Sequence, residues 1–120
     1  QPENCGMQYC RAKSFDGFAP LGPVLVSPAA LPDPSNLSIQ TRVNGELRQS
    51  ASTAQMIFDV PHIIRYMSQG TTLRKGTVIM TGTPSGVAAF MDPPAWLKNG
   101  DVVEIEIEGI GTIRDTMVFQ

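Results

Sequence analysis

Thr81-Gly82-Thr83-Pro84-Ser85-Gly86-Val87 is the stretch on which the predicted fold depends. The run before it, residues 77–80, is apolar and β-branched, which predicts a buried extended strand. A strand that ends in glycine, proline and hydroxyl residues can hold a small anion, because glycine lets the backbone approach a ligand and N–H and O–H groups donate to a carboxylate. The same composition is also typical of an ordinary turn, and no Gly-Lys-Ser/Thr follows that would make it a P-loop.

Length and charge limit the classes of function. The chain has 120 residues, of which 42% are apolar and 17% charged, with a net charge of −2, and this predicts one globular domain at residues 1–120. The interspersed charges give no basic patch for nucleic acid or an anionic membrane. No bilayer-spanning run or signal peptide is recognisable, so the expected compartment is cytoplasmic or mitochondrial. Because the chain begins at Gln1, we expect either a piece of a longer protein or a natural short homologue.

The cysteines and the histidine are too few for a structural zinc site of the usual kind. Cys5 and Cys10 are the two cysteines, and His62 is the only histidine. We expect two free thiols in a reducing compartment, with a short-loop disulfide as the alternative. His62 falls on the polar side of a predicted helix, so a solvated surface position is expected rather than a catalytic one.

Two local patterns predict the elements of the first half. Residues 37–43 alternate apolar and polar side chains, Asn44-Gly45 suits a type I′ turn, and residues 46–49 return as the partner strand. A polar turn is expected over residues 50–53. A helix then follows an Asp59 N-cap, with apolar residues at 60, 63, 64 and 67, and ends at Gly70.

The carboxyl-terminal part predicts a second antiparallel pair. Residues 102–108 alternate strictly, and residues 112–119 follow a glycine-containing turn. Residues 88–99 are irregular and predict an insert or lid. Glu104 and Glu106 share one side of their strand and could hold a divalent cation, but repeated carboxylates there are more typical of a solvated sheet face.

Lys13 is a candidate for proton transfer. It stands beside Phe15 and Phe18, before a proline- and glycine-rich entry to the apolar run at residues 24–26. Partial removal of water favours the neutral, proton-accepting form of an amine. A surface lysine whose stem covers Phe15 is the alternative.

Several segments, taken in order, resemble the fumarylacetoacetate hydrolase superfamily. The resemblance extends from residue 8 onward, and its segments are residues 11–23, 43–49, 52–58, the helix to residue 68, 76–87 and 99–105. It implies a mixed, β-rich α+β fold, a fumarylacetoacetate hydrolase-like (FAH-like) β-sandwich or roll with one main helix, incomplete here at its amino-terminal side. Members are usually homodimers that bind Mg²⁺ or a similar ion such as Mn²⁺ or Ca²⁺. They hydrolyse carbon–carbon bonds of diketo acids, decarboxylate 2-oxo acids, or interconvert keto and enol forms.

The resemblance also assigns roles to residues. It implies that Lys13 is catalytic and that Thr83, with Gly82, binds substrate, and it makes Gln49 a further candidate for a substrate contact. The metal-binding carboxylates of the family lie upstream of the lysine motif, so we expect no metal ligand in this chain, and Glu104 and Glu106 belong to a different segment. A glycine usual in the family is replaced here by Ala88.

Three readings of function remain open. The first is part of a metal-dependent enzyme acting on a small 2-oxo or diketo acid, whose partner is a second copy or a complementary amino-terminal fragment; the chain alone is then expected to be inactive. The second is a truncated, non-catalytic module that acts in dimerisation or regulation. A free-standing carboxylate-binding domain is a third and less favoured reading.

Overall fold

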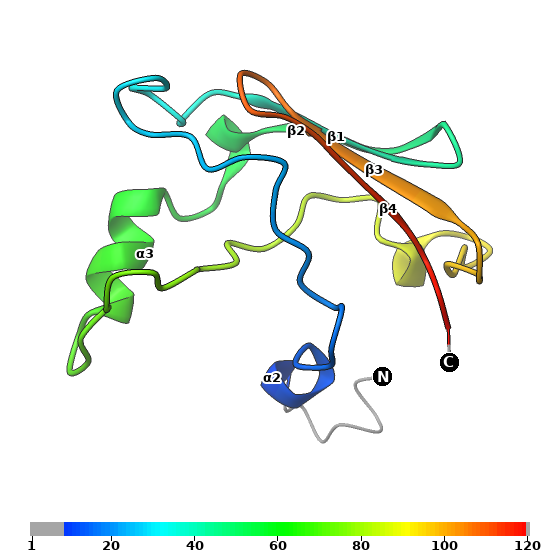
Figure 1. The fold of residues 1–120 in the computed structure, drawn as a ribbon, viewed down its shortest axis with the longest axis horizontal. Coiled ribbons are helices and arrows are strands. Elements are labelled where there is room, and N and C mark those ends of the chain that lie inside the picture. The colour runs from blue at the N-terminus through cyan, green and yellow to red at the C-terminus, as the bar shows by residue number, and fades with distance from the viewer. Residues whose placement is uncertain (1–8, 120) are drawn as a thin grey trace.

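The computed structural model, which describes residues 9–119, contains a four-stranded antiparallel sheet that lies along one side of the molecule (Figure 1). The strands are β1 (Ser38–Val43), β2 (Glu46–Ser52), β3 (Val102–Ile107) and β4 (Gly111–Thr116), in the order β2-β1-β3-β4. The helices are α2 (Tyr9–Ala12), η1 (Thr53–Gln55), α3 (Val60–Met67) and η2 (Ala88–Phe90), where η denotes a 3₁₀ turn. This arrangement confirms the predicted β-rich α+β class with one main helix.

The first predicted hairpin is present. Asn44 and Gly45 have φ angles of 51° and 81°, the positive values that a type I′ turn requires. The polar turn expected over residues 50–53 is wrong, because β2 continues to Ser52, which pairs with Ser38. Ser52 then caps η1 by accepting a hydrogen bond from the N–H of Ala54.

The two hairpins join through β1 and β3, which pair Ile39 with Ile107 and Thr41 with Ile105. One face of the sheet is therefore apolar. On the other face Arg42 lies 3.4 Å from Glu106, and Arg114 lies 3.3 Å from Glu104. The glutamates thus form ion pairs on an open sheet face, as the alternation predicts.

A β-bulge interrupts the pairing of β1 with β2. Thr41 pairs with Gln49 but Arg42 pairs with Leu47, so Arg48 is the extra residue. A bulge breaks the strict alternation of side chains and bends the strand, so neighbouring residues can approach the same side of a sheet. Arg48 and Gln49 both line one cavity over the apolar face.

Helix α3 has the predicted signals at both ends. The Asp59 side chain accepts a hydrogen bond from the N–H of His62 at 2.8 Å, and Gly70 follows the helix with a φ of 71°. His62 is exposed, as expected, and its ring stacks on Phe58 with centroids 4.8 Å apart. Within residues 9–119, every helix is too short or too polar to cross a lipid bilayer.

The predicted strand at residues 77–80 is wrong. These residues and residues 24–26 form no paired strand, since a strand needs a neighbour to accept its hydrogen bonds and none lies beside them in the described chain. β4 is also shorter than expected and ends at Thr116.

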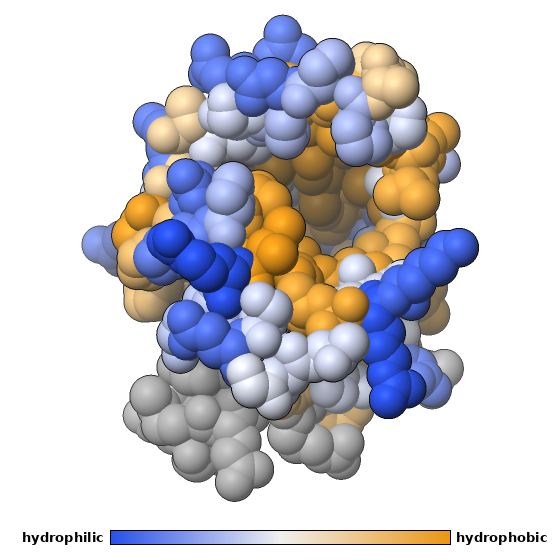
Figure 2. All heavy atoms as spheres, turned by 90° about the vertical axis from the view of Figure 1, so that its left-hand side faces the viewer, coloured by the Kyte–Doolittle hydropathy of each residue, from blue (hydrophilic) through white to orange (hydrophobic). Residues whose placement is uncertain are grey.

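Very little of the apolar surface is covered. Leu37, 8% exposed, is the one buried apolar side chain in the described part of the chain, whereas Leu25 and Ile57 are 101% and 91% exposed. Figure 2 shows apolar side chains gathered around a hollow on one face. The accessible surface is 9794 Å², compared with about 6,300 Å² expected for a compact protein of this mass.

Candidate functional site

The bend at residues 81–87 lies against strand β2. Gly86 has a φ of +96°, and a side chain there would lie far inside the contact distance of the Arg48 carbonyl oxygen. Its added carbon would also come within 3.2 Å of the Gln49 side chain. Only glycine allows the two backbones to approach this closely.

Gln49 connects β2 to the bend by side-chain hydrogen bonds. Its NH₂ group shares two hydrogens among three acceptors: the Thr83 hydroxyl at 2.9 Å, the Pro84 carbonyl at 3.0 Å and the Ser85 carbonyl at 3.2 Å. The structure thus brings together two of the residues selected from the sequence, Gln49 and Thr83. Whether either contacts a substrate stays a prediction.

A cavity of about 190 Å³ lies next to these hydrogen bonds. It is lined by Thr41, Val43, Arg48, Gln49, Gly86, Val87, Ala88, Met91, Ala95, Leu97 and Val103. The Arg48 guanidinium donates to the Met91 sulfur at 3.2 Å and lies 3.4 Å from Glu46. The buried Nε of Arg48 has no hydrogen-bond partner in the part of the chain that the structure describes.

Arg48 and Gly86 were not among the site residues selected from the sequence, although Gly86 stands in the stretch on which the predicted fold depends. A glycine three residues after Thr83 is a visible signal of close backbone approach, but no motif indicates which strand it approaches. The inclusion of Arg48 depends on the bulge, which the alternation of residues 46–49 does not reveal.

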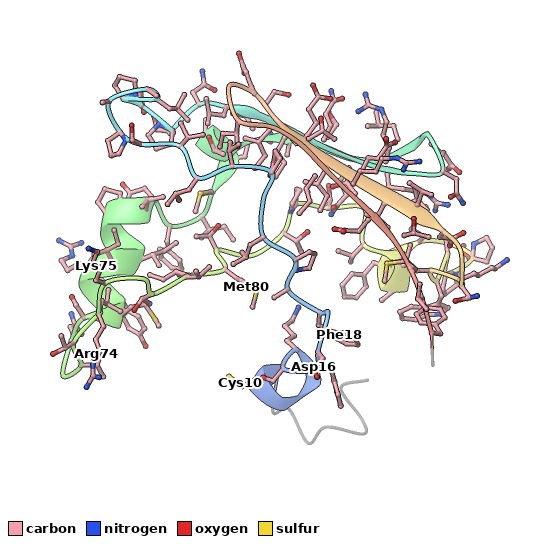
Figure 3. The ribbon with its side chains drawn as sticks, in the orientation of Figure 1. Cys10, Asp16, Phe18, Arg74, Lys75 and Met80 are labelled. Carbon is pink, nitrogen blue, oxygen red and sulfur yellow. The ribbon has the colours of Figure 1, made fainter. Side chains whose placement is uncertain are left out.

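Lys13 follows α2 directly, and its side chain is exposed. Its backbone N–H donates to the Cys10 carbonyl at 3.2 Å. Figure 3 labels Cys10 and Phe18 on either side of this position, on a segment that Figure 1 shows well away from the sheet, and it labels Met80 on the chain that leads to the bend. Two hollows in the described part of the chain, the cavity above and one lined by residues 38, 40 and 106–111, include neither Lys13 nor Thr83 in their lining. A shared substrate site for these two residues stays a prediction.

The described residues do not fit a metal site. Residues 9–119 contain no group of three or more His, Cys, Asp or Glu side chains placed to bind one ion. Glu104 and Glu106 are each paired with an arginine, and Glu108 accepts a hydrogen bond from the N–H of Ser38 at 3.0 Å. Cys10 is an exposed free thiol, whereas Cys5 lies outside the described residues.

Residues 88–99 contain η2 and otherwise have no regular structure. Ala88, Met91, Ala95 and Leu97 line the cavity together with residues of β1, β2 and β3, so this segment packs over the apolar face of the sheet. Its role as an insert or lid stays a prediction.

Known proteins resemble this chain over most of its length. A cattle (Bos taurus) protein described as oxaloacetate tautomerase FAHD2B, mitochondrial, is 50% identical over 113 residues, which are 94% of this chain and 36% of that protein. The solved structure of a fumarylacetoacetate hydrolase from Exiguobacterium antarcticum is 47% identical with a TM-score of 0.92, over 98% of this chain and 42% of that one. A maleylpyruvate hydrolase from Sphingobium sp. SYK-6, solved with manganese(II) and pyruvate, is 35% identical with a TM-score of 0.78, over 87% and 37%.

The chain therefore spans about a third of the length of the curated relatives it matches. The family model for the fumarylacetoacetate (FAA) hydrolase C-terminal region matches residues 1–118. Sequence and overall fold agree, and this chain belongs to the fumarylacetoacetate hydrolase family.

Proposed function

We propose that this chain is the carboxyl-terminal part of a metal-dependent enzyme that acts on 2-oxo or diketo acids, with keto–enol tautomerisation of an oxaloacetate-like acid as its reaction. The observation that carries the proposal is the bend, in which Gln49 holds the exposed Thr83 hydroxyl by a hydrogen bond. The chain that contains this bend is 50% identical in sequence to an oxaloacetate tautomerase. Hydrolysis of a carbon–carbon bond and decarboxylation are the alternative reactions, since both also pass through an enolate.

Each candidate residue has a defined task in this proposal. The Thr83 hydroxyl and the backbone of Gly82 donate hydrogen bonds to an oxygen of the acid. Lys13 donates to a second oxygen or moves the proton between carbon and oxygen. A divalent cation, Mg²⁺ or Mn²⁺, would supply positive charge beside the enolate, and because the described residues do not fit one, its ligands belong to a complementary amino-terminal segment or a second copy.

Substitution of Lys13 tests the proposal in the native protein that carries this chain. Lys13→Met should lower kcat for the tautomerisation of enol-oxaloacetate about a hundredfold, as loss of a proton-transfer group does. The reaction is followed by the ultraviolet absorbance of the enol. Lys75→Met, an exposed lysine after α3, is the matched control and should leave kcat unchanged.

Two results would count against the proposal. An unchanged kcat in Lys13→Met would show that Lys13 is a surface lysine without a catalytic role. No turnover of oxaloacetate or of an acylpyruvate by the unaltered protein would favour the second function, a non-catalytic module in dimerisation. The exposed apolar surface around the hollow in Figure 2 is the observation that supports that alternative.

A further inference from the structure

We infer that Gln49 is a positioning residue, which orients the Thr83 hydroxyl as a donor toward an acceptor oxygen of the bound acid. This inference rests on the proposed function. It assigns Gln49 an indirect role, through Thr83, in place of a direct contact between Gln49 and the substrate. Gln49 is half-buried beside the bulge, on the same side of the sheet as the cavity and the bend.

The surrounding atoms fix which end of the Gln49 amide faces the bend. Two of its three neighbours are the carbonyl oxygens of Pro84 and Ser85, which can only accept hydrogen bonds. An amide oxygen at this position would be repelled by both. The NH₂ group must therefore face the bend, because only a donor can satisfy both carbonyl oxygens.

The same donor determines what the Thr83 hydroxyl does. Its oxygen accepts from Gln49 at 2.9 Å, which leaves the hydroxyl hydrogen to point elsewhere. Within the bend the hydroxyl donates to the Pro84 carbonyl at 3.3 Å, a longer contact than the 3.0 Å bond which that oxygen accepts from Gln49. Because Thr83 is exposed, its hydroxyl can exchange this long bond for a shorter one to a ligand oxygen that accepts, such as a carboxylate or keto oxygen.

Gly86 fixes the other end of the bend. Because its backbone lies against the Arg48 carbonyl, residues 83–86 are held to β2 at two points, one polar and one steric. A hydroxyl held in this way loses little rotational freedom when a ligand binds, which is the general advantage of preorganisation.

The first test measures the bend without any activity. In the native protein that carries this chain, Gln49→Glu replaces the donor by an acceptor of the same shape. The backbone ¹⁵N order parameters of residues 82, 83, 85 and 86 should then fall from about 0.85 toward 0.6, because the bend is released from β2. Gln69→Glu makes the same chemical change on an exposed side chain after α3 and should leave those order parameters unchanged. Unchanged order parameters in Gln49→Glu would overturn the inference.

The second test asks whether Gln49 acts through Thr83. In the native protein, Gln49→Leu and Thr83→Val should each lower kcat/KM about tenfold, and the double variant should be no worse than Thr83→Val alone. Effects that multiply would show that Gln49 acts independently of the hydroxyl, which overturns the inference. Thr83→Ser, which keeps the hydroxyl, should restore most of kcat/KM.

A third measurement separates this inference from the proposed function. Pyruvate, added to the ¹⁵N-labelled native protein, should shift the amide signals of residues 82, 83, 85 and 86, and Gln49→Glu should weaken that response about tenfold. If the native protein turns over no keto acid and pyruvate shifts nothing, both the proposed function and the ligand role of Gln49 fail. If turnover fails but pyruvate still shifts these signals in a Gln49-dependent manner, the proposed function alone is wrong.

Discussion

At the scale of single residues, the close approach of two backbones gives Gly86 its importance. We predict that Gly86→Ala destabilises the chain by about 2 kcal/mol or more, because a left-handed conformation and a steric clash add together. Gly76→Ala is the matched control, since Gly76 has a similar φ of +85° but open space around its missing side chain. Urea unfolding followed by circular dichroism measures both. Equal losses in the two variants would mean that contact with β2 contributes nothing.

The sequence contains signals for candidate side chains, but no signal for how those side chains meet. Thr83 was recognisable from its place in a glycine- and proline-rich loop, whereas Gln49 was selected only by resemblance. Their hydrogen bond depends on a register shift that no short pattern encodes, because Arg48 becomes the bulge residue only when β2 pairs with β1. The placement of Lys13 depends equally on long-range packing, so its role stays a prediction.

At the scale of elements, one cluster of side chains connects the two hairpins. The Asn44 amide donates to Asp101 at 2.9 Å, and the N–H of Lys98 donates to the other oxygen of that carboxylate at 2.7 Å. The oxygen of the Asn44 side chain accepts in turn from the N–H of Val102 at 2.9 Å. The turn of the first hairpin is thereby fixed to the start of β3.

These hydrogen bonds, first that from Asn44 and then that from Lys98, lower the pKa of Asp101 below its usual value. The ionised Asp101 carboxylate therefore stabilises the folded chain fully at pH values above the pKa of an aspartate in the unfolded chain, about 3.9. This stabilisation is lost as the pH falls through the lower pKa that Asp101 has in the folded chain. We predict that Asp101→Asn makes the urea midpoint fall less steeply below about pH 4. Asp115→Asn on strand β4 is the control, and a slope that changes equally in both variants would contradict the prediction.

The elements that the sequence predicts best are those stabilised locally. The Asn44-Gly45 turn and the Asp59 cap of α3 are complete within a few residues, and both are present. The pairing of β1 with β3 joins segments some sixty residues apart and left no local signal. Residues 77–80 have the composition of a strand but have no neighbouring strand to pair with. A high β propensity therefore does not by itself place a segment in a sheet.

The molecule taken as one body has a larger solvent-accessible surface than a compact protein of its mass. The radius of gyration is 15.8 Å, compared with about 14 Å for a compact chain of 120 residues. The accessible surface exceeds that of a compact chain by more than the roughly 800 Å² that one partner contributes to a standard interface. The amphipathic face of α3 belongs to this surface, since Val60, Ile64 and Met67 remain 40–47% exposed.

We predict that the isolated chain associates with itself or binds a hydrophobic dye, because an apolar surface of this size is unfavourable in water. Sedimentation velocity should show species heavier than the 13.0 kDa monomer, in proportions that rise with concentration. Combining Leu25→Gln with Ile57→Gln should reduce both association and dye fluorescence, since these side chains are among the most exposed, while Thr72→Gln at an exposed polar position should change neither. A monomer that binds no dye at any concentration would show that the exposed apolar surface is stable in water without a partner. Association that survives the double substitution would place the contact elsewhere on the chain.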